Sequence, residues 1–113
     1  HVGQTVAKGQ GIGTQSATGQ VVLAHTAEEA NEKTTNSSIL VTIATDKDYI
    51  PAFEKAAAVI TVSGGITSHA AVVGLSLGKP VIVGVENAME ILKEGMEVSV
   101  YAEVGVIHLD DNK

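Results

Sequence analysis

The residues best suited to chemistry lie in one short stretch, Gly64-Gly65-Ile66-Thr67-Ser68-His69. A glycine pair lets the backbone turn sharply and lets another molecule approach closely. Free N–H groups at the start of a following helix can hold an anion. A neutral histidine in the first turn of that helix can act as a nucleophile toward phosphorus. The stretch therefore predicts His69 as the candidate catalytic residue, beside an anion site formed by Gly64, Gly65, Thr67 and Ser68.

A single histidine near a helix start is more often a structural or capping residue than a catalytic one. Both roles therefore stay open for His69 when it is considered alone. Ser68 precedes it directly, but neighbouring side chains on a helix point in different directions, so a serine–histidine nucleophile pair is not expected. The ordered Gly-Gly-x-Thr-Ser-His context is what favours a chemical role.

The composition limits the classes of function open to this sequence of 113 residues. Its formal net charge is −6 and only 3% of its residues are aromatic, so nucleic acid and anionic membranes are not expected partners. It contains no cysteine, and all seven of its basic residues are lysines. The sequence therefore lacks arginine, the side chain that best holds a phosphate through two parallel hydrogen bonds.

Other patterns are weak candidates for ligand binding. The spacing in Gly9-Gln10-Gly11-Ile12-Gly13 does not match a dinucleotide-binding fingerprint, and no strong strand precedes it. Asp46-Lys47-Asp48 is not followed by the glycine and glutamate of a calcium loop, so a helix start is expected there. His1, His25 and His108 lack metal-ligand spacing and are expected at the surface. No metal site is predicted.

The apolar pattern places the candidate stretch between a strand and a helix. Strands are predicted over 21–24, 39–43, 58–62, 81–83, 98–101 and 104–109. Helices are predicted over 27–33, from an N-cap at Asp48, over 68–77 with Thr67 as the cap, and from Asn87. Residues 1–20 are expected to form turns and short strand ends. Strands alternating with helices, followed by paired strands, indicate an α/β fold with a mixed sheet and packed helices.

The stretch from Gly64 to Val73 resembles the phosphohistidine signature of the phosphoenolpyruvate-utilising enzymes, and the similarity continues through Leu77–Gly84. The resemblance implies a swivelling β/β/α domain. It also implies that His69 matches the phosphoryl-accepting histidine, that Thr67 matches its neighbouring threonine, and that Gly64 and Gly65 match the glycine turn.

One departure points to a narrower group within this family. The dikinase-type pattern has an arginine six residues after the histidine, where this sequence has Leu75. Residues 67–78, 6–13 and 83–88 instead resemble the extra C-terminal domain that some bacterial pyruvate kinases carry. This resemblance implies an accessory domain that is structural or regulatory and is inactive when isolated. A phosphoryl carrier, in which His69 is the transiently phosphorylated catalytic residue and Thr67 is its catalytic partner, stays open as the alternative.

The same resemblance carries expectations about the parent protein. Residues 1–113 are expected to be a single domain taken from a longer, cytoplasmic and homo-oligomeric enzyme. The partners of this domain are then the other domains of that chain. No cofactor is expected in this domain, whereas the parent enzyme is expected to use Mg²⁺ and K⁺.

Overall fold

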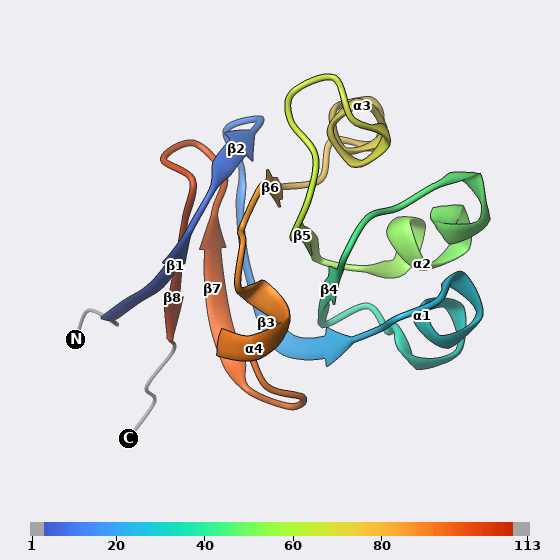
Figure 1. Ribbon diagram of the computed structural model, residues 1–113, viewed down its shortest axis with the longest axis horizontal. Helices are drawn as coiled ribbons and strands as arrows, with labels where there is room; N and C mark the ends of the chain where they lie inside the picture. Colours follow the sequence, from blue (N-terminus) through green and yellow to red (C-terminus); the bar gives the residue numbers. More distant parts are fainter. Residues whose placement is uncertain (1–3, 110–113) are drawn as a thin grey trace.

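The computed structural model describes residues 4–109, in which one sheet packs against helices (Figure 1). His1 lies outside the described residues. The strands are β1 (Gln4–Lys8), β2 (Gln10–Ile12), β3 (Ser16–Leu23), β4 (Ser38–Thr42), β5 (Ala58–Thr61), β6 (Val81–Val83), β7 (Glu97–Tyr101) and β8 (Val106–Leu109). The helices are α1 (Ala27–Lys33), the 3₁₀ helix η1 (Lys47–Tyr49), α2 (Ile50–Lys55), α3 (His69–Leu77) and α4 (Ala88–Ile91). None of these helices has the length and apolar character needed to cross a membrane.

The sheet is mixed, with the strand order β1-β8-β7-β3-β4-β5-β6-β2. Its centre, from β3 to β6, is parallel, because helices connect these strands in turn. The strands β7, β8 and β1 on one side, and β2 on the other, pair antiparallel. The predicted α/β class with a mixed sheet and packed helices is confirmed.

The sheet folds over so that the molecule has three layers, β/β/α. In Figure 1 the strands β1, β7 and β8 lie on one side of the central strands, and α1, α2 and α3 lie on the other. Successive side chains of β4 point to opposite faces of the sheet and so contribute to two apolar clusters. Leu40 packs with Phe53 of α2 in one cluster, whereas Ile39 and Val41 pack with Val100 of β7 in the other. All five of these side chains are fully buried.

The chain from β1 to β2 joins the two edges of the sheet, because β1 pairs with β8 and β2 pairs with β6. Close backbone contacts hold this crossing in place. The Gly9 N–H donates to the carbonyl of Gly105 at 2.9 Å. A Cβ added to Gly11 would lie 1.6 Å from the carbonyl oxygen of Ala102, so only glycine fits there. The structure thus gives these two glycines of the 9–13 stretch a packing role.

The sequence prediction underestimated the strands of the first twenty residues. β1 and β2 are present, and β3 begins at Ser16 rather than at Val21. Glycine is typical of turns, but Gly19 lies within β3 at a point where the carbonyl of Ser37 comes close, which leaves no room for a side chain. At the other end of the chain, β8 begins at Val106 because residues 102–105 form a turn.

Two predicted helix starts were also placed wrongly. Asp46, not Asp48, is the capping residue: its carboxylate accepts the N–H of Asp48 at 2.9 Å and begins η1. The following helix, α2, then begins at Ile50 with no side-chain cap. The cap of α3 is Ser68 rather than Thr67. In each case several polar residues in a row could serve as the cap, and the local turn selects one of them.

The predicted helix over 27–33 is confirmed, including its cap, because Thr26 accepts the N–H of Glu29 at 3.0 Å. The N–H of His25 donates to the Glu29 carboxylate, and with the neighbouring Lys33 it lowers the pKa of Glu29. Desolvation lowers the pKa of Lys33, but its hydrogen bonds and attraction to Glu94 and Glu29 outweigh this and raise it. The Lys33 ammonium also donates to the carbonyl of Leu23, and so ties α1 to β3.

Candidate functional site

His69 is the first residue of α3, and its side chain is held from a different part of the chain. Its Nδ1 lies 2.8 Å from the hydroxyl oxygen of Thr45, which follows β4. β4 and β5 are parallel neighbours, so the segments that follow them emerge at the same edge of the sheet. This edge, outside the carboxyl ends of parallel strands, is where α/β folds commonly bind ligands.

Thr45 is the site residue that the sequence reasoning missed. One signal in the sequence pointed to it. Thr45 follows the predicted strand at 39–43 just as Gly64 follows the predicted strand at 58–62. If these two strands are parallel neighbours, the residues that follow them must meet. The sequence alone did not establish that pairing, so Thr45 could not be chosen over other hydroxyl residues.

The turn before α3 owes its shape to Gly64 and Ser68. Gly64 has a φ of +104°, and a Cβ there would lie 2.9 Å from the Cβ of Ser68. The Ser68 hydroxyl donates to the carbonyl of Gly65 at 2.8 Å and accepts the N–H of Ala71 at 3.4 Å. The φ angle of Gly65 is not positive, and the atom nearest to a Cβ added there would be 3.9 Å away. The two glycines are therefore not equivalent.

A hollow of about 100 Å³ lies beside the imidazole. The predicted residues Gly64, Ser68 and His69 line it, together with Thr45 and other small residues of the strand ends. Gly65 and Thr67 do not line this hollow. The structure thus brings three of the five predicted site residues together, and it leaves Thr67 exposed, with no side-chain hydrogen bond to residues 4–109.

Of the four hydroxyl groups that line this hollow, three direct their protons to backbone carbonyls, and the fourth, that of Thr45, faces Nδ1 of His69. Thr61 donates to the carbonyl of Ser63 at 2.7 Å, Ser63 donates to the carbonyl of Ile43 at 2.9 Å, and Ser68 donates to Gly65 as described. A hydroxyl has one proton, so each of these groups can offer a further partner only its lone pairs. Lone pairs repel an anion, so the side chains of Thr61, Ser63 and Ser68 do not form a phosphate cradle.

The backbone offers the remaining donors. Among residues 4–109, no acceptor lies within hydrogen-bonding distance of the N–H groups of His69 and Ala70, which point out of the first turn of α3. Free N–H groups at a helix start favour negative charge. The predicted anion site at this turn stays a prediction, and these two amides are donors that it could use.

The imidazole has one arrangement that suits attack on phosphorus. If Nδ1 carries the proton and donates to Thr45, the lone pair of Nε2 is free. No lysine lines the hollow, and its lining residues apart from His69 are all uncharged. Leu75, at the place of the family's arginine, is 63% exposed on α3. A phosphoryl group on Nε2 would therefore find no cationic side chain in the lining of the hollow, whereas the Thr45 hydroxyl, which accepts from Nδ1 in this arrangement, keeps its own proton free.

The other histidines lie away from this site. His25 is at the surface, 3.7 Å from the carboxylate of Glu29. His108 is partly buried, with its ring tilted against that of Tyr101 at a centroid distance of 5.0 Å. Within residues 4–109, no three His, Cys, Asp or Glu side chains come together in a way that could hold a metal ion.

Comparison with known proteins gives consistent matches. Residues 34–105 match the family model described as PEP-utilising enzyme, mobile domain. The pyruvate kinase of Geobacillus stearothermophilus is 58% identical over 107 residues, which are 95% of this chain and 18% of that protein. The phosphoenolpyruvate synthase of Aeropyrum pernix is 40% identical over 106 residues, which are 94% of this chain and 13% of that protein. This chain thus spans less than a fifth of the length of these relatives.

A solved structure supports the fold alone. The crystal structure of Thermococcus kodakaraensis aconitase X has a TM-score of 0.70 to this chain at 20% identity. The match covers 93% of this chain and 98% of that one. At this level of identity the likeness carries no argument about chemistry.

Proposed function

Because this chain belongs to the PEP-utilising enzyme mobile domain family, we propose that it is the accessory C-terminal domain of a bacterial pyruvate kinase, with a structural or regulatory role. The family predicted from the residues around His69 is thereby confirmed. The observation that carries the proposal is the 58% identity to a pyruvate kinase over 95% of the chain. The parent enzyme then transfers phosphate from phosphoenolpyruvate to ADP, in a part of the protein outside this chain.

The geometry around His69 supports a role without catalysis. Pyruvate kinase transfers phosphate directly between its substrates, so the proposed parent needs no phosphohistidine. In agreement with this, three of the four hydroxyl protons around the hollow are donated to backbone carbonyls, and no lysine lines it. The hydrogen bond between Thr45 and His69 then serves to join the segment after β4 to the start of α3.

The same proposal says where the parent enzyme holds its metal ions and what this domain contacts. In this proposal the Mg²⁺ and K⁺ of the parent enzyme are held by its other domains, where the transfer from phosphoenolpyruvate to ADP takes place. This domain, over residues 1–113, contacts other domains of the parent chain. The parent itself is a cytoplasmic homo-oligomer.

A second function is favoured by one specific observation, the 40% identity to a phosphoenolpyruvate synthase over 94% of the chain. In that case the domain is a swivelling phosphoryl carrier. The lone pair on Nε2 of His69 forms a bond to phosphorus as the bond between phosphorus and the donor oxygen breaks. The backbone amides at the start of α3 are the available donors for the transferred group.

One experiment separates the two functions. The whole parent protein, and the same protein with His69→Ala, are incubated with phosphoenolpyruvate and examined by phosphorus NMR and intact mass. Turnover with ADP is measured on both. The proposed function predicts no phosphoryl group on either protein and equal pyruvate kinase turnover.

An acid-labile phosphoryl group on the parent that His69→Ala removes would reject the accessory role and establish the carrier. Thr67→Val is a matched control within the same motif, because the Thr67 side chain lies outside the hollow. If this variant keeps the label that His69→Ala removes, the phosphoryl group is on the histidine and the loss is not caused by a disturbed turn.

A further inference from the structure

The two most exposed large apolar side chains among residues 4–109 lie on either side of one short loop. Val104, in the turn between β7 and β8, is 69% exposed, and Leu75 of α3 is 63% exposed. The loop of residues 13–15, between β2 and β3, borders a hollow next to each of them. We refer to this loop with Leu75, Tyr101 and Val104 as the loop 13–15 surface.

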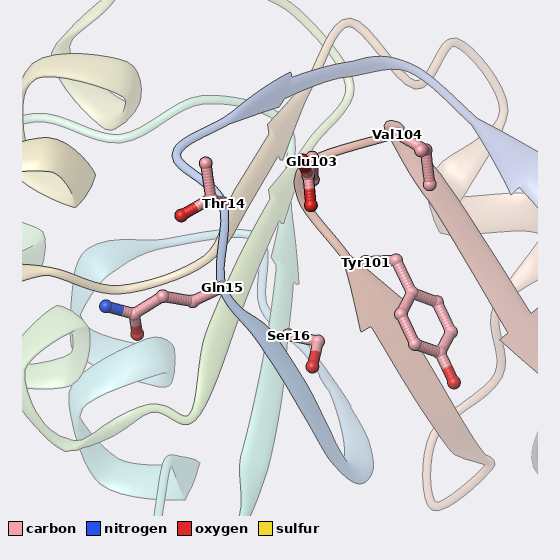
Figure 2. A pocket seen from close by; sticks show the side chains of 6 residues that line it. All are labelled: Thr14, Gln15, Ser16, Tyr101, Glu103 and Val104. Carbon is pink, nitrogen blue, oxygen red and sulfur yellow. The ribbon is translucent and has the colours of Figure 1, made fainter.

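The two hollows share Thr14 and Gln15 as part of their walls. The one on the α3 side has a volume of about 180 Å³, and the one on the β7 side about 260 Å³. Figure 2 shows the second: the side chain of Gln15 points away from Tyr101 and so leaves the space between the loop and β7 open. Each hollow can receive an apolar side chain of a partner, with the Gln15 amide available at the boundary between them.

The surface carries little charge although the sequence has a formal net charge of −6. Of the residues that line the two hollows, Lys79 and Glu103 are charged. The Lys79 ammonium is engaged by the backbone carbonyls of Glu54 at 2.9 Å and Ala56 at 2.7 Å. α3 itself contains no acidic residue and no lysine. A helix that is apolar on its outer as well as its inner face is normally covered.

We propose that the loop 13–15 surface is where this domain docks onto another domain of its own parent chain. The inference rests on the proposed function, because it requires the parent to be a longer enzyme. The relatives support this, since the matched segment is 18% of the length of the pyruvate kinase. A covalently linked neighbour is present at an effective concentration in the mM range, so a small apolar surface suffices to hold it. Contacts between domains of one chain are typically of this modest, partly polar kind.

A second copy of this domain fits the surface less well. Two copies that each carry a formal charge of −6 repel one another. They also lack the tether that makes a weak apolar contact effective. The partner is therefore a region of the parent that presents apolar side chains to the two hollows and a hydrogen-bonding group to Gln15.

The surface lies at the opposite end of the sheet from the candidate site. Ile12, just before the loop, pairs with Val81 at the start of β6. The loop is thus at the amino ends of the parallel strands, whereas Thr45 and His69 meet at the carboxyl ends. Docking through the loop 13–15 surface leaves the hollow beside His69 uncovered.

The test uses the full-length parent enzyme with a photo-cross-linking residue, p-benzoylphenylalanine, in place of Val104 or of Leu75. The matched control has it in place of Ile43, which is 48% exposed and follows β4 at the carboxyl end of the sheet. Cross-linked peptides are identified by mass spectrometry after irradiation. We expect positions 104 and 75 to cross-link to parent residues outside this chain, and position 43 to give no such product.

Three results would overturn the proposal: no product from positions 104 and 75, products that join two copies of this domain, or equal products from position 43. Phosphoryl transfer from phosphoenolpyruvate to ADP is measured on the same preparations. Activity without the cross-links rejects the docking surface and leaves the proposed function standing. The cross-links without activity reject the proposed function and leave the docking surface standing.

Discussion

Replacing Gly64 with alanine tests the account of the turn that leads to His69. At a φ of +104° any other residue is strained, and the new methyl group would lie 2.9 Å from the Cβ of Ser68. The backbone strain costs about 1–3 kcal/mol, and we expect a total loss of about 2 kcal/mol in the free energy of unfolding. In a domain of this size such a loss lowers the melting temperature by roughly 8–10 °C, which thermal unfolding followed by circular dichroism will detect.

Gly65→Ala is the matched control, one residue away in the same motif. Its φ is not positive and the nearest atom to an added Cβ lies 3.9 Å away. We expect this variant to unfold at the same temperature or to gain about 0.4–1 kcal/mol, because alanine restricts the unfolded chain. Equal destabilisation by the two substitutions, or a larger loss for Gly65→Ala, would refute the assignment of the turn to Gly64.

Three further substitutions test other parts of the structure. Gly11→Ala should cost about 3 kcal/mol or more of unfolding free energy in urea titrations, because the new methyl group overlaps a backbone carbonyl of the turn after β7. Thr45→Val should cost about 1 kcal/mol and release the ring of His69, seen as altered NMR contacts of its protons. Folding lowers the pKa of Glu29. The free energy of unfolding that Glu29 contributes is therefore fully present above its pKa in the unfolded chain, and it is lost as the pH falls through its pKa in the folded protein. Glu29→Gln should therefore flatten the loss of stability at acid pH.

These substitutions have their own controls and contrary outcomes. Gly13→Ala has nothing within 4 Å of the new methyl group and carries only the strain of a positive φ, so it should cost less than Gly11→Ala. Thr67→Val removes an exposed hydroxyl outside the hollow and should leave the His69 ring unchanged. Equal effects within either pair would contradict the contacts described. Identical acid slopes for Glu29→Gln and the unsubstituted chain would contradict the contribution of Glu29.

The sequence by itself determined the class of fold and the segment around which the candidate site forms. The strands at 39–43, 58–62 and 81–83 were predicted because short apolar runs bounded by polar and turn residues are typical of buried strands, and the helix over 68–77 because a polar cap precedes it and Gly78 and Pro80 end it. The order Gly-Gly-x-Thr-Ser-His identified the family without any tertiary information. The absence of arginine was evident from the composition, and it bears directly on the chemistry open to His69.

The tertiary structure alone decided the features that depend on residues far apart in the chain. Thr45 joins the site because β4 and β5 pair in parallel, and Gly11 is required because β1 and β2 cross to opposite edges of the sheet. The Ser63 hydroxyl donates to the carbonyl of Ile43, twenty residues away in the chain, which composition cannot reveal. Leu75 and Val104 become one surface only when α3 and the β7–β8 turn pack on either side of residues 13–15. Periodicity reports which side of an element is buried, but strand pairing and chain crossings determine which elements meet.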